Sequence, residues 1–432
     1  MKDGFFKNDR IGALLDASPY FYLILSAAVR LATGLIFLKF LAWQFGPSTF
    51  GLLTQIMGTA AIFYMFAGGG ITNGVIRNVS AATSEVERQR WMSAGATITV
   101  LSSLALAAIA VVLALFGGSA IFGEPDFAPV FVGIAAAQIP VGFGHLVLAY
   151  FSGIGDNRAF AVVQIVANIL SLLLLVALAL GLGRTGAVSG LVIAPAATGA
   201  VALWYIFRRV AHRGMFRIVW DPPLLKNLLS YGVVMASTVT AVPVAQLLIR
   251  IDMSERLGWT AVGYWQAIAK LSDAYMLFVG VIIINFLLPQ LSKRHEAASA
   301  LRMLLRFGGL MLGVFVVAGG MIYSVRDHLL LIVYSGQFLI ASNLVLAQLV
   351  GDSLKVAFLL LQYYFMSREQ MLIIFVSELM LGVALYTLYL VLAPSYGAIA
   401  PIYAYAAVYA ALLLVMIALL HVTKGCANSP TS

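Results

Sequence analysis

The sequence predicts an all-α, polytopic membrane protein in which twelve transmembrane helices form two pseudo-symmetric six-helix lobes around a central cavity. Three observations support this: a very apolar composition, apolar runs long enough to cross a bilayer, and a one-sided distribution of lysine and arginine. Of the 432 residues, 62% are hydrophobic and only 10% are charged, with a mean hydropathy of +0.99. Soluble domains are about 45–50% apolar and about 25% charged, so most of this surface must face lipid.

Apolar runs of about 20 residues, the length that crosses the hydrocarbon core, recur along the whole chain. The first run is longer than the apolar core of a signal peptide and lacks a small-residue cleavage site, so we expect it to remain as the first helix. Reading these runs between polar, glycine and proline breaks predicts spans at residues 20–45, 51–79, 92–116, 127–152, 158–181, 186–207, 224–250, 260–290, 303–325, 338–366, 371–393 and 398–421.

The positions of lysine and arginine predict how the spans are oriented. Eighteen of these residues fall on one side of the predicted membrane, whereas only Arg184, Arg256 and Arg326 fall on the other. Because the cytoplasmic side carries the excess of basic residues, both termini are predicted to be cytoplasmic. The same asymmetry accounts for the formal charge of +9 without a nucleic-acid partner.

An internal repeat predicts the division into lobes. A basic cytoplasmic linker at 208–223 separates residues 1–207, the predicted N-terminal lobe, from residues 224–432, the C-terminal lobe. Two parallel six-helix repeats with a cavity between them are a common transporter plan. The repeat pairs Phe45–Gln55 with Leu257–Gln266 at an offset of 212 residues, and pairs Arg158, Asn168 and Gly186 with Arg368, Glu378 and Gly397 at an offset of 210 to 211.

Apart from basic residues near the predicted cytoplasmic ends, eight charged residues fall inside the predicted spans. A charge at the bilayer centre costs about 2.5–3.5 kcal/mol on insertion scales, so each is expected to face a cavity or a partner. Lys270 and Asp273 are three residues apart on one helix face, as are Asp352 and Lys355, so each pair can neutralise itself as a structural ion pair. The eight are Arg30, Lys39, Arg250, Lys270, Lys355, Asp273, Asp352 and Glu378.

The five cations exceed the three acids by two, which favours an anionic ligand over a cationic drug. Arginine and lysine match a pyrophosphate group at short range. Lys39 and Arg250 have an alternative role, because their side chains could extend to the outer headgroups. We therefore predict a pyrophosphate site formed by Arg30 and Lys270, with Lys39, Arg250 and Lys355 as second choices.

Asp273, Asp352 and Glu378 are candidates for ion coupling or for structural pairing. Glu378 is the best placed for coupling, because no cation lies three or four residues from it in the sequence. No metal or cofactor is predicted: the single cysteine, Cys426, and the five histidines show no metal-ligand spacing.

Gly68-Gly69-Gly70 interrupts the second predicted span. It lacks the strand–loop–helix context of a phosphate-binding loop, so we predict a hinge or a close helix crossing built on small residues.

Four segments resemble the Wzx-type flippases of lipid-linked oligosaccharides, which belong to the multidrug/oligosaccharidyl-lipid/polysaccharide (MOP) transporter superfamily. Within that family the likeness is greatest to the flippases of enterobacterial common antigen lipid III and of O-antigen repeat units, and it extends over most of the chain. The segments are Ala67–Val75, Val262–Gln266 with Leu271–Tyr275, Leu288–Ser292 and Gln348–Val356.

The resemblance implies a V-shaped, alternating-access transporter that moves an undecaprenyl-pyrophosphate-linked oligosaccharide from the cytoplasmic to the periplasmic leaflet. It implies energy from an ion gradient or the membrane potential, without ATP, and candidate partners in a polymerase and a chain-length regulator of the polysaccharide pathway. In the related lipid II flippases, cations on the first, second and eighth helices are functional. Arg30 and Lys270 lie on corresponding helices, but the second span carries only Arg77, near its cytoplasmic end.

Two other functions stay open at this point. A cation-coupled multidrug exporter of the same superfamily would confer drug resistance and would be indifferent to loss of the intramembrane cations. A membrane-embedded glycan polymerase or transferase would need a sizeable loop outside the membrane or paired acids near its surface, and the sequence shows neither.

Overall fold

The structure, a computed structural model, describes residues 19–117, 121–122, 127–209, 215–294 and 296–427, and these contain no β-strand. A π-helical turn at Ile283–Leu287 follows α10, and short 3-10 segments at Gly336–Leu344 and Gly397–Ile399 precede α14 and α16. The α-helices are α2 (Pro19–Met65), α3 (Thr72–Ala81), α4 (Glu85–Phe116), α6 (Ala128–Gly153), α7 (Asn157–Ile193), α8 (Ala196–Arg209), α9 (Pro222–Val239), α10 (Ala241–Ile282), α11 (Leu288–Ser292), α12 (Ala297–Ser324), α13 (Arg326–Val333), α14 (Val345–Ser367), α15 (Met371–Tyr396) and α16 (Ala400–Ala427).

Four glycines with positive φ divide the longest helical stretches into pairs of spans. Gly46, Gly183 and Gly258 interrupt α2, α7 and α10, and Gly397 separates α15 from α16. This backbone conformation strains residues that carry a Cβ, so glycine permits the chain to turn there. Seven helical stretches are long and apolar enough to cross a membrane. Dividing the described helices at these glycines and at the loops gives the twelve predicted spans.

The chain forms two compact units of similar size. The first consists of Met1–Phe37, Ala60–Ala120 and Glu124–Ala236, and the second of Leu38–Thr59, Ile121–Gly123 and Ser237–Ser432. The parts of spans 1 and 2 on either side of Gly46, residues Leu38–Thr59, therefore pack within the second unit, although their sequence precedes it. The division between units thus does not follow chain order alone, and part of the predicted linker, residues 210–214, lies outside the described residues.

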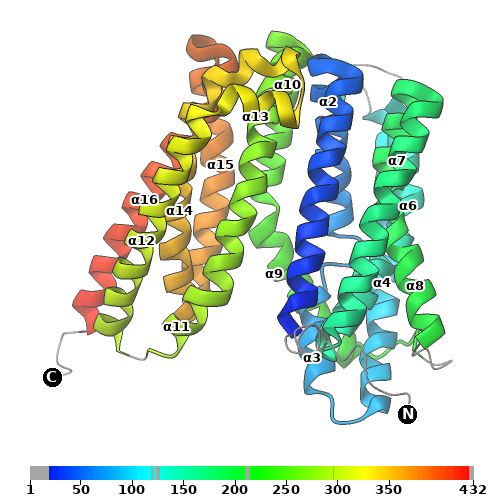
Figure 1. The fold of residues 1–432 in the computed structure, drawn as a ribbon. Helices are drawn as coiled ribbons and strands as arrows, with labels where there is room; N and C mark the ends of the chain where they lie inside the picture. Colours follow the sequence, from blue (N-terminus) through cyan, green and yellow to red (C-terminus); the bar gives the residue numbers. More distant parts are fainter. Residues whose placement is uncertain (1–18, 118–120, 123–126, 210–214, 295, 428–432) are drawn as a thin grey trace, which may run out of the picture. The chain divides into compact units, whose positions relative to one another are not determined.

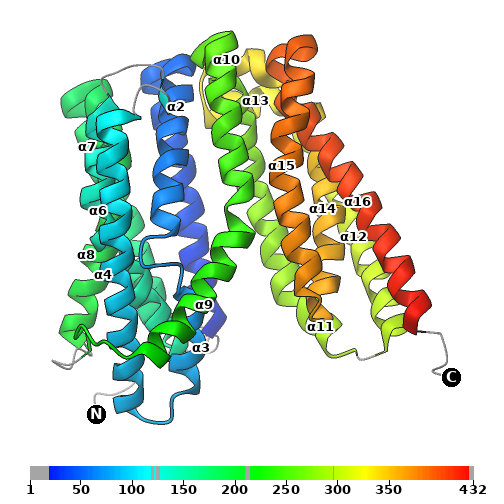
Figure 2. The ribbon, with the colours of Figure 1, turned by 180° about the vertical axis from the view of Figure 1, so that it is seen from behind.

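Each unit has a bundle of helices that run side by side (Figures 1 and 2). In the first unit, α6 packs against α3, α4, α7 and α8. Small residues permit this contact: a Cβ at Gly199 would lie 1.8 Å from the carbonyl oxygen of Pro140. In the second unit α16 packs against α14 and α15, and α12 against α14, around an aromatic core that includes Phe358 and Tyr409.

The backbone turns repeat between the two halves of the sequence. Gly46 and Gly258 are 212 residues apart, which is the offset that the sequence predicts. Two further pairs of positive-φ residues, Gly155 with Glu369 and Gly183 with Gly397, are each 214 residues apart. Because the turn glycine is Gly183, the predicted pairing of Gly186 with Gly397 is wrong by about one helical turn.

Span 2 is broken in the middle. The α2 helix ends at Met65 and α3 begins at Thr72, and Gly68, Gly69 and Gly70 between them all have positive φ. The break is also a close crossing, because a Cβ at Gly232 would lie 2.3 Å from the carbonyl oxygen of Gly69. This confirms the close crossing predicted for the glycine triplet.

Candidate functional site

Arg30 lies in the first unit, about ten residues into span 1, and its side chain is exposed. The guanidinium has no hydrogen-bond or ion-pair partner among the described residues; only the backbone carbonyl of Arg30 accepts a bond, from Thr33 Oγ1 at 3.1 Å. An arginine without a partner inside a membrane span is costly unless it faces water or a ligand. Arg30 is therefore free to bind an anion.

Lys270 forms the ion pair that its spacing predicts. Its Nζ atom lies 3.1 Å from Asp273 Oδ2, one turn along α10. The side chains are 29% and 57% exposed, so the protein does not enclose either charge. An ammonium group has three donors, so Lys270 can bind an anion without releasing Asp273.

Asp352 is fully buried and is held by neutral donors from three helices. Ser272 Oγ lies 2.8 Å from both carboxylate oxygens, and Tyr405 Oη lies 2.7 Å from Oδ1. Tyr275 also donates to Oδ2, and Gln348 Nε2 donates to Oδ1 at 3.1 Å. Hydroxyl groups can both donate and accept, so this network can satisfy Asp352 whether its carboxyl group is ionised or protonated.

Lys355 does not pair with Asp352, contrary to the prediction from their spacing. Among the described residues its ammonium lies instead over the rings of Tyr405 and Tyr409, 5.7 and 5.9 Å from their centroids. Such cation–π contacts stabilise a desolvated ammonium by about 2 kcal/mol. The aromatic rings come from α16, which local spacing on α14 could not have indicated.

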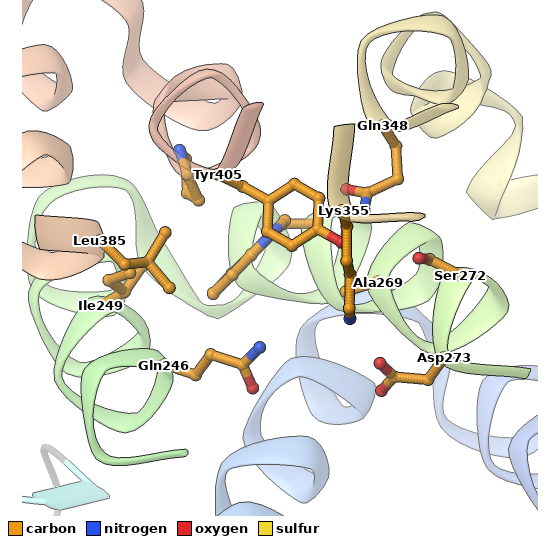
Figure 3. Close-up of a pocket in the computed structure, with 11 residues that line it drawn as sticks. Gln246, Ile249, Ala269, Ser272, Asp273, Gln348, Lys355, Leu385 and Tyr405 are labelled. Carbon is orange, nitrogen blue, oxygen red and sulfur yellow. The ribbon is translucent and has the colours of Figure 1, made fainter. Parts of the chain in front are cut away.

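A small pocket within the second unit brings these groups together (Figure 3). Lys355 and Asp273 point into it together with Gln246 and Gln348, and Tyr405 forms part of its wall. The pocket offers a water molecule about 30 Å³ of accessible volume, and one water needs about 10–15 Å³. It can therefore hold one or two waters or a small ion.

Glu378 is partly buried on α15, where Gln362 Nε2 of α14 donates to its Oε1 at 2.6 Å. The sequence singles out Glu378 because no cation lies nearby on its own helix, and its partner is indeed an uncharged amide from another helix. Like Asp352, it is an acid held by neutral groups.

The last two predicted cations, Arg250 and Lys39, form contacts between Leu38–Thr59 and the rest of the second unit. Arg250 is only 3% exposed, and its Nε donates to Gln55 Oε1 at 2.6 Å. Its guanidinium covers Gly58, where a Cβ would lie 2.2 Å from Nη2. Lys39 Nζ lies 2.5 Å from the carbonyl oxygen of Ile332, at the C-terminal end of α13, where a cation is favoured by the helix dipole. Arg250 is thus a packed side chain and does not extend to the headgroups.

Sequence reasoning missed the neutral partners of the charged groups. Tyr275 and Ser272 lie inside Leu271–Tyr275, a segment already singled out, and Gln348 precedes Asp352 by one turn, so spacing could have found these three. Tyr405 and Gln55 come from distant parts of the chain, and no local signal indicates them.

The chain is similar to known proteins over most of its length. A family model described as "Polysaccharide biosynthesis protein" matches residues 19–295. The "Lipid III flippase" of Escherichia coli (strain K12) and that of Shigella flexneri are each 29% identical over 391 residues, covering 89% of this chain and 93% of the relative.

Two solved structures share the fold. "Lipid II flippase MurJ, inward closed conformation" superimposes with a TM-score of 0.72 at 14% identity, covering 93% of this chain and 87% of the other. A multidrug resistance MATE family transporter of the MOP superfamily in its inward-facing conformation gives a TM-score of 0.72 at 11% identity, covering 94% of this chain and 100% of the other. At such identities these likenesses show the fold alone.

Proposed function

Because the chain belongs to the polysaccharide biosynthesis protein family, we propose that it is a flippase for an undecaprenyl-pyrophosphate-linked oligosaccharide, either lipid III of enterobacterial common antigen or an O-antigen repeat unit. The observation that carries this proposal is the similarity to lipid III flippases, which extends over 89% of the chain. The protein is a multi-pass membrane protein. We propose that it lies in the bacterial inner membrane with both termini in the cytoplasm, and that it moves the substrate to the periplasmic leaflet by alternating access.

Arg30 and Lys270 are the proposed ligands of the pyrophosphate. Arg30 is exposed without a partner among the described residues, and Lys270 keeps free donors beside Asp273. The other three candidates are already engaged: Lys39 by carbonyl groups, Arg250 by Gln55, and Lys355 by aromatic rings. Arginine suits this role because its planar guanidinium can bind phosphate through two parallel hydrogen bonds.

Asp352 and Glu378 are the proposed coupling groups for an ion gradient or the membrane potential. Three hydroxyl groups and an amide surround Asp352, and an amide meets Glu378. These neutral partners can adapt to gain or loss of a proton more readily than a fixed cation could. A polymerase and a chain-length regulator remain proposed partners at the membrane.

The test is complementation of a bacterium that lacks its own lipid III and O-antigen flippases, scored by polysaccharide at the cell surface. Wild type is expected to restore export and Arg30→Ala to abolish it, with Arg30→Lys intermediate because lysine keeps the charge but loses the bidentate geometry. Arg302→Ala is the matched control, since Arg302 is exposed and lies outside the predicted spans.

Protein levels in the membrane must be equal for all variants. Wild-type export by Arg30→Ala would remove Arg30 from the site. If wild type fails to restore export with every repeat unit tested and confers drug resistance on overexpression, the multidrug exporter becomes the better supported function.

A further inference from the structure

The first unit contains buried polar side chains that the proposed flippase mechanism does not use. Gln138 is 0% exposed, and neither its Oε1 nor its Nε2 has a hydrogen-bond partner among the described residues. Thr99 is also 0% exposed, and its Oγ1 likewise lacks a partner there. Leaving a buried donor or acceptor unsatisfied costs about 1–3 kcal/mol, so these three atoms point to a ligand.

These side chains surround the break in span 2. A helix that stops inside the membrane leaves its last carbonyl groups short of the usual intrahelical partners. Here the carbonyl groups of Phe63, Tyr64 and Phe66 accept from backbone N–H groups of the break, and those of Tyr64 and Phe66, which accept one such bond each, keep a second lone pair for a ligand. Such irregular backbone is tolerated at membrane depth only where protein buries it or a polar cavity receives it. The break at residues 66–71 follows the C-terminal end of α2, which carries the negative end of the helix dipole.

Contacts along α6 show that Gln138 faces this helix end. Phe131 packs edge-on against Phe63, in the last turns of α2, with ring centroids 6.5 Å apart. One turn beyond Gln138, a Cβ at Gly142 would lie 2.9 Å from the backbone nitrogen of Gly68. Gln138 lies between these two contacts on the same helical stripe, so it belongs to the face of α6 that packs against the end of α2.

Hydroxyl groups from α4 and a ring from α6 complete the cluster. Thr99 Oγ1 would lie 3.5 Å from a Cβ at Gly68. Ser103, one turn further along α4, donates from Oγ to the backbone carbonyl of Gln138 at 3.3 Å. His145 Nδ1 lies 3.4 Å from the carbonyl oxygen of Ala67. Two hydroxyls therefore lie beside the backbone of the broken helix, and Gln138 lies on the same face of α6.

We propose that the break in span 2 is a binding site for a monovalent metal cation, sodium, formed by Thr99, Ser103, Gln138 and the terminal carbonyl groups of α2. Hard cations prefer oxygen ligands, and unwound backbone carbonyls together with half-helix C-terminal ends bind sodium in transporters built from discontinuous helices. None of these ligands is a carboxylate, so the site offers only partial negative charge. This suits one positive charge and disfavours calcium or magnesium.

The experiment uses the purified full-length protein in detergent, with ²²Na⁺ as the probe and choline replacing sodium at constant ionic strength. Wild type is expected to bind about one sodium per chain saturably, and its thermal midpoint is expected to rise with sodium, because a ligand of the folded state stabilises it. Thr99→Val and Gln138→Met keep the shape of each side chain and remove its oxygen. Each is expected to weaken sodium binding at least tenfold.

Melting in choline separates loss of the ligand from loss of the fold. Without sodium, both variants are expected to melt at or above the temperature of wild type, because removing an unsatisfied buried polar atom is neutral or stabilising. Thr99→Ser retains the hydroxyl and is expected to retain binding. Thr59→Val is the matched control: Thr59 is buried in the second unit, where its hydroxyl donates to Gln55 O at 3.0 Å.

Three outcomes would overturn the proposal. The first is no saturable ²²Na⁺ binding by wild type, which would leave only ordered water at the break. The others are equal stabilisation by sodium and choline, and unchanged sodium binding by both Thr99→Val and Gln138→Met. The assay contains no lipid-linked glycan. Its result is therefore independent of whether the protein is a flippase.

Discussion

The two units share a backbone plan but differ in the polar groups that they place inside the membrane. The first unit buries uncharged groups, namely Thr99, Ser103 and Gln138, around a broken helix. The second unit places Lys355 and Asp273 in the lining of a small pocket, pairs Asp273 with Lys270, and buries Asp352 behind Ser272 and Tyr405. The turns at Gly46 and Gly258 correspond in both halves of the sequence. Repetition has thus preserved where the chain turns and not what it can bind.

This difference indicates a division of roles. Groups that change charge can respond to a proton or a membrane potential, whereas hydroxyls and amides can only ligate. In the first unit, Arg30 is an exposed charge about ten residues inside a span, and it has no partner in the described part of the chain. We therefore expect substitutions of charged groups inside the spans to alter transport most, at Arg30 in the first unit and at Asp352 in the second, and substitutions of packed glycines to affect both units alike.

The largest effect is expected at Asp352. Asp352→Asn keeps the shape and one acceptor oxygen but cannot ionise, so export is expected to be lost while the protein still folds. Asp352→Ala leaves the donors of Ser272, Tyr275 and Tyr405 unsatisfied and is expected to lower stability by about 3 kcal/mol. Surface polysaccharide and thermal melting measure the two effects. If Asp352→Asn exports at the wild-type level, the Asp352 carboxylate is structural, and the proposed difference in role between the two units is wrong.

An intermediate effect is expected from the close glycine contacts, one in each unit. A Cβ at Gly199 would lie 1.8 Å from Pro140 O in the first unit, and one at Gly263 would lie 2.0 Å from Pro47 O in the second. Both alanine variants are expected to lose about 1–3 kcal/mol by overpacking, measured by denaturant or thermal unfolding in detergent. Gly34→Ala is the control, because no atom lies within 4 Å of its Cβ position. If only one of the two alanine variants loses stability, the close helix contacts of the two units are not equivalent.

The smallest effect compares the turns at Gly155 and Glu369. Both have positive φ, 74° and 59°, and they correspond in the repeat, but only one is glycine. Glu369→Gly is expected to stabilise the protein by about 1 kcal/mol, and Gly155→Ala to destabilise it by a similar amount. Melting temperatures of the two variants check the signs. Destabilisation by Glu369→Gly would mean that the carboxylate makes a contact that outweighs the strain.

The number of spans and their main turns could be predicted from the sequence, because bilayer thickness fixes helix length and glycine marks the sharp turns. The Lys270–Asp273 ion pair was also predictable, since both residues lie on one helix face. The same rule failed for Asp352 and Lys355, where Tyr405, 53 residues away, provides a hydroxyl for one and a ring for the other. Spacing along a helix detects only local partners, and a buried carboxylate is satisfied by whichever donors the tertiary fold brings to it.

The assignment of Leu38–Thr59 to the second unit has a mechanical consequence. The chain enters and leaves this segment inside two membrane spans, near Phe37–Leu38 and near Thr59–Ala60, without a loop at either place. Lys39 and Gln55 fasten the segment at both of its ends, through Ile332 and Arg250. Any rotation of one unit is therefore expected to bend spans 1 and 2 together, because both helices continue from one unit into the other. A helical connection of this kind would transmit a movement of one unit to the other, whereas a flexible loop would not.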